Sequence, residues 1–317
     1  MKPKSLAQAI AFYLQSRRQL GFALEHQGDL LANLAHYAQA KGHRGALTHS
    51  LALAWCQVPS AEHSLRRARR LEVVRGFARF WAAFDPRTQV PSAGLFGPAH
   101  RRRPVPIYSP AQIAALLAAA EQLPPPASLR PLTLRTLLGL LACTGLRISE
   151  ALELELSDWE ETQAVLTIRQ SKWGQSRYVP LQPSAAAALK SYLHARGKAF
   201  PQGNEPALFL DGRGRRLTYR QASTTFRELR NQLGWHQEPQ PRLHDLRHTF
   251  AVSCLLGWYR RGEAEVNQKI LALAVYLGHR NIRHTYWYLT AVPELLALGS
   301  ARGAKAFAPQ EGAAHDA

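Results

Sequence analysis

Apolar residues recur every three or four positions along the first 84 residues of the chain, which is the period of a helix that buries one face. The pattern is clearest at residues 10–13, 30–37 and 71–81. Between Ser5 and about Phe84 it leaves room for four helices of about 12 to 18 residues each. The sequence therefore predicts a small N-terminal four-helix bundle.

This periodicity stops between Asp85 and Pro110, where the chain holds six prolines and the triplet Arg101, Arg102 and Arg103. Proline-rich segments without periodicity form extended linkers. The pattern therefore divides the chain into four parts. We predict a first domain at 1–88, a basic linker at 89–107, a second domain at 108–300 and a flexible tail rich in glycine and alanine at 301–317.

Alternation with a period of two appears in the second domain. Residues 165–169 and 177–181 alternate on either side of the turn signal Ser-Lys-Trp-Gly, which predicts a β-hairpin with Lys172 at or near its tip. A helix starts at Ser109, and others are expected at 131–143, 184–193, 218–233, 246–257, 266–277 and 283–298, the last broken near Pro293. The fold class is therefore mainly α, with a mostly helical α+β second domain that contains a small antiparallel β-sheet.

The charge of the chain narrows the choice of partner. The sequence has 40 Lys+Arg against 22 Asp+Glu, a formal net charge of +18. Such an excess favours a polyanion, nucleic acid first and an acidic membrane surface second, and it excludes an acidic or neutral enzyme of ordinary surface. Because 46% of the residues are hydrophobic and 20% are charged, as in ordinary globular proteins, the basic residues belong to a folded body.

The cysteines and the apolar runs indicate the compartment. Cys56, Cys143 and Cys254 stand far apart within apolar stretches and form no Cys-x-x-Cys pair. This pattern is typical of buried thiols in a reducing cytoplasm. Nowhere do about 18 apolar residues follow one another, so no membrane span and no membrane partner is expected. We therefore expect a cytoplasmic protein.

A set of basic residues followed by a tyrosine carries the candidate chemistry. Arg147 lies in Thr-Gly-Leu-Arg-Ile-Ser-Glu, His244 and Arg247 lie in Leu-His-Asp-Leu-Arg-His-Thr-Phe, and His279 ends Leu-Gly-His. Tyr288 follows His279 by nine residues. Each string alone is weak evidence, but the combination is specific. In its motifs, their spacing and the domain order, essentially the whole chain resembles the tyrosine recombinases, or phage integrase family, of site-specific DNA recombinases.

The resemblance implies a fold, a reaction and a partner. The N-terminal bundle would be a SAM-like core-binding domain that binds DNA, and the second domain would be catalytic. Tyr288 would attack a scissile phosphate, form a 3′-phosphotyrosyl link and release a 5′-hydroxyl, with no ATP, metal or other cofactor. The substrate would be double-stranded DNA with a specific recombination site, cut and rejoined by a homo-oligomer that is expected to be a tetramer on DNA.

The chemistry of phosphodiester cleavage also calls for these residue types. The transition state gathers charge on two non-bridging oxygens, which Arg147 and Arg247 could bind bidentately. A phenol of pKa ~10 is about one part in a thousand ionised at neutral pH, so the tyrosine needs neighbouring cations or a base. Lys172 could give a proton to the leaving alkoxide, His244 could act as acid or base, and His279 could hydrogen-bond the phosphate.

The same residues allow more ordinary interpretations. Arg147 could pair with Glu150 one turn along its helix. His244 and His248 have the i, i+4 spacing of a zinc helix, although Asp245 replaces the glutamate of that motif and no third ligand is evident. Asp245 would more simply orient a neighbouring base or cap the helix that follows.

Two assignments have direct competitors. Tyr286 lies two residues before Tyr288 and could itself be the nucleophile. Residues two apart on a helix point about 200° apart, so only one of them can face the arginines, and the spacing from His279 favours Tyr288. Lys172 could be an ordinary solvated lysine, since the family commonly has a Thr-Lys-Gly type of turn where this chain has Ser-Lys-Trp-Gly.

A second group of arginines is expected to bind the DNA backbone. It comprises Arg66, Arg67, Arg69 and Arg70 in a predicted helix and Arg101, Arg102 and Arg103 in the linker. The helical arginines lie opposite an apolar face, so they either form a solvated surface or follow the phosphates while both domains close on the duplex as a clamp. The apolar segment 293–298 either packs on its own domain or, as the resemblance implies, on a neighbouring subunit.

Two other functions fit part of the pattern. A type IB topoisomerase would use the same chemistry as a monomer, to relax supercoils without a defined site. A catalytically silent DNA-binding accessory protein would need the basic surface but not the tyrosine. The sequence contains no Gly-x-x-x-x-Gly-Lys-Ser/Thr loop of the kind that binds ATP.

Overall fold

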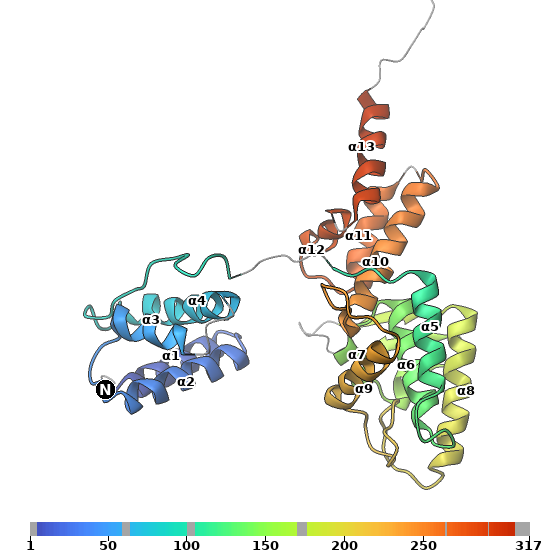
Figure 1. Cartoon of the computed structure of the whole chain (residues 1–317), viewed down its shortest axis with the longest axis horizontal. Helices are drawn as coiled ribbons and strands as arrows, with labels where there is room; N and C mark the ends of the chain where they lie inside the picture. The colour runs from blue at the N-terminus through green and yellow to red at the C-terminus, as the bar shows by residue number, and fades with distance from the viewer. Residues whose placement is uncertain are drawn as a thin grey trace, which may run out of the picture. The chain divides into compact units, whose positions relative to one another are not determined.

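The computed structural model describes residues 5–58, 64–99, 105–169, 176–263, 265–290 and 292–307, the side chains of 302–307 excepted. The chain forms two compact units, Met1–Arg103 and Pro104–Ala317 (Figure 1). In the described part of the chain, no helix is both long enough and apolar enough to cross a membrane.

Four helices make up the described core of the first unit, as predicted. They are α1 (Leu6–Gln19), α2 (Glu25–Ala40), α3 (His49–Gln57) and α4 (Ser64–Trp81). Their apolar faces meet in one core, where the fully buried side chains include Leu31, Leu34, Trp55, Val74 and Phe77. Helix α3 has 9 residues and is shorter than expected, because Thr48 caps its start and Pro59, which has no amide hydrogen, follows its end in the sequence.

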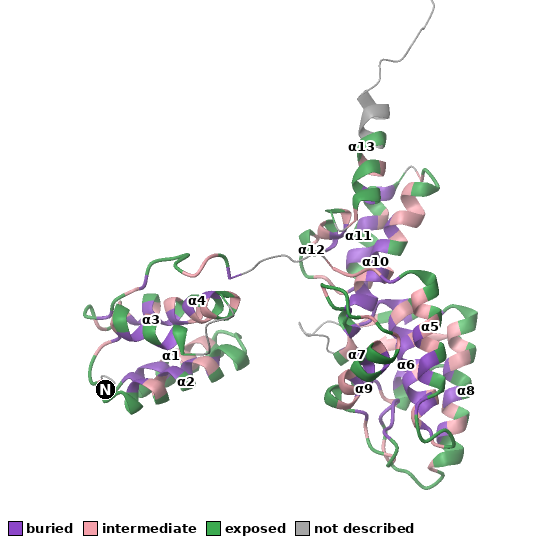
Figure 2. Cartoon of the chain, in the orientation of Figure 1, coloured by how far each residue is buried: buried purple, intermediate pink, exposed green. Residues whose placement is uncertain are grey.

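The core of the second unit is built around the apolar helix α6 (Arg130–Thr144). It packs against α5 (Pro110–Glu121), α8 (Pro183–Ala199) and α10 (Leu243–Arg260). Figure 2 shows buried residues along much of α6. This helix is therefore the rigid support on which the following turn is mounted.

The turn after α6 requires a glycine. Gly145 has a φ of 63°, and a Cβ atom there would overlap the ring of Phe250 on α10. After this turn, Arg147 is the residue immediately before the short helix α7 (Ile148–Glu153). The arginine of the first motif therefore lies on a tightly packed turn between two helices.

A small antiparallel sheet confirms the predicted hairpin. After the 3-10 turn η1 (Leu156–Asp158), the strands β1 (Trp159–Glu160), β2 (Val165–Ile168) and β3 (Arg177–Pro180) lie in the order β1-β2-β3. Leu166 pairs with Val179, and both are buried. Lys172 lies outside the described residues, as does the rest of 170–175.

The remainder of the second unit is helical. It contains α9 (Tyr219–Gln232), α11 (Val266–Tyr276), α12 (Arg283–Tyr286), the 3-10 segment η2 (Trp287–Thr290) and α13 (Pro293–Phe307). The helix expected at 283–298 is thus three pieces, and the last begins at the proline where a break was predicted. Helix α13 runs to Phe307, beyond the residue 301 at which the sequence suggested a flexible tail, because alanine, arginine and lysine predominate there and favour a helix.

Helix α13 packs on its own unit. Leu295 is buried in the same apolar cluster as Leu255 of α10, and the Arg260 Nε donates to Glu294 Oε1 at 2.8 Å. Leu296 on the same helix is 53% exposed. This helix therefore packs on its own domain through Glu294 and Leu295, and packing on a neighbouring subunit stays a prediction.

The three cysteines are free but not all buried. Cys56 is buried and Cys254 is half-buried. Cys143 is exposed, so the expectation that all three thiols are buried was wrong for this one. It lies near the end of α6, where the helix face that does not meet the core opens to solvent.

Candidate active site

The predicted catalytic residues that the structure describes come together in the second unit. We call Arg147, His244, Arg247, His279 and Tyr288 the tyrosine site. They come from the turn after α6, from α10, from the turn after α11 and from η2. Lys172 lies outside the described residues.

Arg247 connects all three motifs. From α10, its Nη1 donates to the Gly145 carbonyl (2.8 Å) and its Nη2 donates to the Leu277 carbonyl (2.6 Å). The residue is 2% exposed. Burial, followed by the nearby Arg147, lowers the pKa of Arg247 to about 10. The guanidinium therefore stays charged at neutral pH in a fixed orientation.

Arg147 makes the pair with Glu150 that the sequence left open. Its Nη1 lies 2.6 Å from Glu150 Oε1, and the side chain of Glu150 is only 5% exposed. The same guanidinium also donates through Nη2 to the Gly278 carbonyl (3.0 Å). The Arg147 side chain keeps 19% of its surface exposed. The ion pair therefore orients this arginine and leaves part of it open to a ligand.

Tyr288 lies beside these arginines and is itself 2% exposed. Its ring centroid is 6.1 Å from that of His279, with the planes 27° apart, and 5.5 Å from that of His248. Burial raises the pKa of the Tyr288 phenol, and the opposing effects of Arg247 and Arg147 do not cancel that increase. In this state the phenol is protonated, so attack requires a proton acceptor.

The competing tyrosine lies on the surface. Tyr286 is the last residue of α12 and is 42% exposed. The histidine rings of the site contact Tyr288, two residues further on. The geometry therefore favours Tyr288 as the tyrosine that faces the arginines.

The histidines around Tyr288 are neutral at pH 7. Burial, followed by Arg247, lowers the pKa of His279 to about 3, and burial, followed by His244, lowers the pKa of His248 to about 3. The pKa of His244 is also lowered, first by the surrounding protein and then by Arg247. His279 Nδ1 is 2.8 Å from Thr285 Oγ1, which fixes its ring. A neutral imidazole can accept or donate a proton, as the proposed chemistry needs.

Asp245 caps α10, one of the uses that the sequence suggested. It is fully buried and accepts hydrogen bonds from the Arg242 amide (2.8 Å) and from the Arg242 guanidinium (2.9 Å). His244 and His248 meet edge to face, with centroids 4.7 Å apart. Among the residues that the structure describes, no three His, Cys, Asp or Glu side chains are grouped so that they could hold a metal ion.

Arg177 belongs to the site, although the sequence analysis missed it. From the start of β3 it donates to both carboxylate oxygens of Glu150, at 3.1 and 2.7 Å, and to the Tyr276 carbonyl, at 2.7 Å. A signal was present in the hairpin pattern, since the register pairs Arg177 with the buried Ile168. An arginine at such a position predicts an acidic partner inside the protein.

A basic groove borders the tyrosine site along α9. It has a volume of about 710 Å³, and both His244 and Ile148 line it. Its arginines come from α9 and from the residue before α10; they are Arg220, Arg227, Arg230 and Arg242. Because His244 lines both the groove and the tyrosine site, a polyanion in the groove would meet the site.

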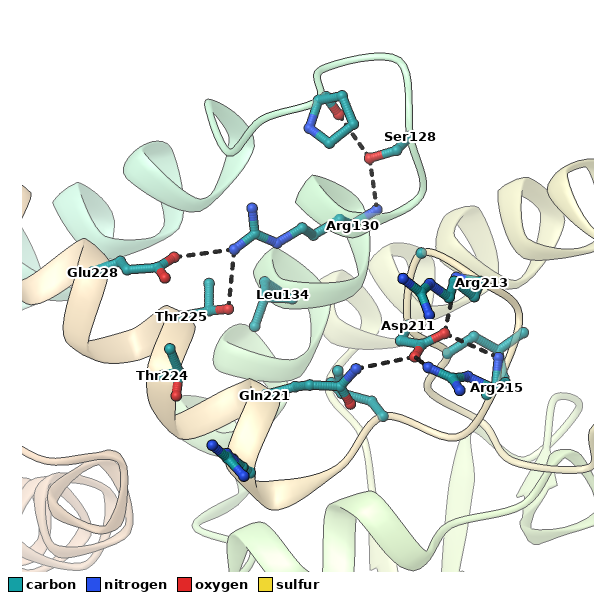
Figure 3. A pocket seen from close by; sticks show the side chains of 15 residues that line it. Ser128, Arg130, Leu134, Asp211, Arg213, Arg215, Gln221, Thr224, Thr225 and Glu228 are labelled. Carbon is teal, nitrogen blue, oxygen red and sulfur yellow. Dashed lines mark hydrogen bonds and ion pairs between the residues drawn. The ribbon is translucent and has the colours of Figure 1, made fainter.

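A second pocket of about 700 Å³ is lined by none of these catalytic candidates (Figure 3). Arg130 at the start of α6 donates to Thr225 Oγ1 (3.2 Å) and to Glu228 Oε2 (3.1 Å), both on α9. Gln221 Nε2 donates to Asp211 in the preceding loop (3.0 Å). The Arg130 bonds hold α9, and therefore the basic groove, against α6, and the Gln221 bond fixes the start of α9 to the loop before it.

The predicted DNA-binding arginines of α4 are not equivalent. Arg66 and Arg69 are exposed, and Arg67 is half-buried. Arg70 donates to the Trp55 carbonyl (2.8 Å) and stacks on the Trp55 ring, 4.6 Å from its centroid. The linker residues of the set are outside the described part of the chain; they are Arg101, Arg102 and Arg103.

A tyrosine beside fixed arginines and neutral histidines suits attack on a phosphodiester, and the relatives of the chain agree. Residues 108–294 match the phage integrase family. The chain is 42% identical over 298 residues to y4rB of Sinorhizobium fredii, described as an integrase/recombinase, with 91% of this chain and 94% of y4rB covered. It is 32% identical to the tyrosine recombinase XerC of Chromobacterium violaceum, with 82% and 80% covered. The chain therefore belongs to the phage integrase family, the tyrosine recombinases, and is a site-specific DNA recombinase.

Solved structures show the same fold. The Tn1549 transposon integrase in complex with transposon right end DNA superposes with a TM-score of 0.70 at 18% identity, covering 96% of this chain and 99% of that one. XerH bound to palindromic difH substrate gives a TM-score of 0.63 at 18% identity, covering 86% and 77%. The family, the mainly α fold and the enzyme class that the motifs predicted are thereby confirmed.

Proposed function

We propose that Tyr288 is the nucleophile that cuts DNA, with Arg147 and Arg247 binding the two non-bridging oxygens of the scissile phosphate. The tyrosine Oη forms a bond to phosphorus while the bond to the 5′ oxygen of the next nucleotide breaks. The products are a 3′-phosphotyrosyl link and a free 5′-hydroxyl. The 5′-hydroxyl of a partner strand then reverses the step and releases the tyrosine.

One observation carries this proposal. The guanidinium groups of Arg147 and Arg247 are held by two successive carbonyls, those of Gly278 and Leu277, directly before His279. The ring of Tyr288 lies against His279. Two permanent cations are thus held by one turn beside the Tyr288 phenol, which is the arrangement that stabilises charge developing on a phosphate.

Protons move through the neighbouring groups. The phenol gives its proton to the neutral His244, His279 hydrogen-bonds the phosphate, and the departing 5′ oxygen receives a proton from Lys172. The phosphotyrosine keeps the energy of the broken bond, so rejoining needs no nucleotide. In this scheme the arginines and the lysine supply the positive charge that a metal ion supplies in many nucleases.

The proposed partner is double-stranded DNA that carries a specific recombination site. The basic groove along α9, the exposed Arg66 and Arg69 and the linker arginines supply cations for its phosphates. In this proposal the first unit is the core-binding domain, both units close on the duplex, and a homo-oligomer, a tetramer on DNA, carries out the exchange in the cytoplasm. The relatives solved with transposon-end DNA and with difH support the choice of partner.

A covalent capture experiment tests the proposal and needs no defined target sequence. Duplexes with a randomised core and a nick, from which the cleaved fragment escapes, are incubated with the protein. Captured DNA is sequenced, and the modified peptide is mapped by mass spectrometry. We expect the adduct on Tyr288, joined through a 3′ phosphate.

Substitution of the tyrosines gives the sharpest outcome. Tyr288→Phe should reduce covalent capture below detection, about 1,000-fold or more, because the attacking oxygen is gone, while DNA binding stays within about threefold of the original protein. Tyr286→Phe, with its side chain at the surface, is the matched control and should capture normally. Loss of the adduct in the Tyr286 variant alone would refute the assignment.

A further inference from the structure

Arg177 lies outside the recombinase motifs, but its partners lie at the end of the first motif and directly before the Leu-Gly-His motif. It starts strand β3, and its side chain is 11% exposed. Its Nη1 and Nη2 bind both oxygens of Glu150, and its Nε donates to the Tyr276 carbonyl at 2.7 Å. This one residue therefore joins the sheet, helix α7 and the end of helix α11.

The end of α11 binds three arginines in succession. The Tyr276 carbonyl accepts from Arg177, the Leu277 carbonyl from Arg247, and the Gly278 carbonyl from Arg147. We call Tyr276, Leu277 and Gly278 the 276–278 turn. The last carbonyls of a helix lack intrahelical partners and carry its negative dipole end, so cations are favoured there. Each arginine comes from a different element, and the turn holds all three in one arrangement.

The packing at Gly278 leaves little freedom. Its φ is 65°, and a Cβ atom there would lie 3.0 Å from Arg177 Nη1 and 3.6 Å from Arg147 Nη1. The two guanidinium groups thus sit directly against the backbone that precedes His279. A shift of Arg177 would therefore displace Arg147 in two ways, through the shared packing against Gly278 and through Glu150.

Glu150 contacts two arginines, of which only Arg147 is proposed to bind the scissile phosphate. Its Oε1 is 2.6 Å from Arg147 Nη1, while Arg177 contacts both of its oxygens. Burial alone would raise the pKa of this carboxyl, but the hydrogen bonds and charge of Arg177, followed by those of Arg147, lower the pKa to about 2. Glu150 Oε2 also accepts from the Arg147 amide (3.0 Å), so without Arg177 both oxygens would be bound to Arg147 alone, and the whole negative charge would act on the Arg147 guanidinium. Arg147 would then be turned away from a phosphate and neutralised.

We propose that Arg177 is a positioning residue of the recombination reaction. It satisfies Glu150, so that Arg147 stays aimed at the scissile phosphate with its charge available. This inference rests on the proposed function of Arg147. Under this proposal, the capture rate falls without Arg177 because the charge of Glu150 then acts on Arg147 alone. Removing the charge of Glu150 as well should therefore restore part of the rate, which a purely structural role of Arg177 would not predict.

The test compares three variants on a duplex that the original protein captures. Arg177→Met keeps the length of the side chain without its charge, and Arg177→Met with Glu150→Gln also removes the carboxylate. Arg196→Met is the matched control, because that buried arginine of α8 likewise ties elements together, through the Glu205 and Ala207 carbonyls, but touches neither the tyrosine site nor the basic groove. Three quantities are measured: DNA affinity, the capture rate at saturating DNA, and the unfolding temperature.

We expect Arg177→Met to slow capture about 100-fold, which is a typical effect of a catalytic group displaced by about 1 Å. Its DNA affinity should stay within about threefold, because most phosphate contacts lie elsewhere. The double variant should regain about tenfold in rate and unfold at a higher temperature than Arg177→Met, since it no longer buries a carboxylate that has lost one of its two cations. Arg196→Met should capture at the original rate.

Three results would overturn the proposal. Capture by Arg177→Met within about threefold of the original rate would show that Arg147 does not depend on Arg177. A double variant as slow as, or slower than, Arg177→Met would leave Arg177 with a structural role only. If the original protein captures no duplex, the proposed function fails. The unfolding temperatures then test the balance between Arg177 and Glu150 on their own. A double variant less stable than Arg177→Met would show that losing Arg177 does not leave Glu150 unbalanced.

Discussion

Arginines are used in opposite ways in the two units of this recombinase. In the second unit, Arg147, Arg177 and Arg247 are each held by a backbone carbonyl of the 276–278 turn. In the first unit, Arg66 and Arg69 extend from α4 as exposed side chains, with no hydrogen bond to any other residue that the structure describes.

The difference teaches what each kind of arginine can contribute. A guanidinium that folding has already fixed loses little freedom when a phosphate arrives, and it favours one geometry, which suits a transition state. A mobile guanidinium adds attraction that depends on salt and hardly on sequence. The second unit should therefore determine the rate of strand cleavage, and α4 should contribute to affinity.

The largest expected effect separates the two kinds of arginine by rate. Arg247→Met should slow covalent capture at saturating DNA by about 100-fold to 1,000-fold, as loss of one preorganised donor does in other enzymes. Arg66→Met should leave that rate unchanged, because its side chain is exposed on α4. Single-turnover capture measures both. Equal losses in the two variants would show that the arginines of the two units do not differ in their effect on the rate.

A pair of glycines tests how rigid the support of the fixed arginines is. Gly145 and Gly42 both have a φ of 63°, but a Cβ at Gly145 would overlap Phe250, whereas a Cβ at Gly42 in the first unit meets nothing within 4 Å. Gly42→Ala should lower the free energy of unfolding by about 1 kcal/mol, the usual strain of that backbone region. Gly145→Ala should lower it by about 3 kcal/mol, since overpacking is added. Urea unfolding checks both, and similar values would mean that the turn can relax.

The pH dependence of stability should also arise mainly at the site. The pKa values of His248 and His279 are lowered to about 3, whereas an unfolded histidine titrates near 6.5. Below that pH the unfolded chain binds protons that the folded chain cannot, so stability falls as the pH drops. By pH 5.5 each histidine should remove about 1 kcal/mol relative to pH 7.5.

Urea unfolding of a matched pair checks this expectation. His248→Gln should lose about 1 kcal/mol less than the original protein between pH 7.5 and pH 5.5. His36→Gln, which changes an exposed histidine of the first unit, should follow the original protein. An identical loss in all three would place the pH dependence elsewhere.

The smallest effect concerns salt. Replacing both Arg66 and Arg69 with glutamine should weaken DNA binding and flatten the slope of log K against log salt concentration by about 1.8, or 0.9 for each phosphate contact. Arg70→Gln is the control on the same helix, because its guanidinium is already bound to the Trp55 carbonyl. A slope that changes as much for Arg70 as for the pair would contradict the role given to the exposed arginines.

Much of the fold follows from local patterns. The helical period located the four helices of the first unit, and the alternation at 165–169 and 177–181 located the hairpin, because both patterns report which face of an element is buried. The sequence analysis expected a longer α3 and an earlier end of α13 than the structure has. Helix ends were hard to predict because capping and fraying depend on a few residues and on tertiary context.

The site was predictable only in part. The motifs named Arg147, His244, Arg247, His279 and Tyr288, and the structure brings these residues together, although their catalytic roles stay predictions. The three arginines on successive carbonyls were not predictable, because backbone oxygens have no signature in the sequence. The hairpin pattern did place Arg177 on the buried face, but its partners, a distant carboxylate and a main-chain oxygen, could not be identified from the sequence.

The use of main-chain acceptors has a consequence for how this sequence can vary. Tyr276, Leu277 and Gly278 accept through backbone oxygens, so the hydrogen bonds to the arginines do not depend on which side chains stand at the first two positions. They depend on the number of residues between α11 and His279. A single deletion or insertion between α11 and His279 would misalign every acceptor with its donor at once, so spacing here should tolerate less drift than composition.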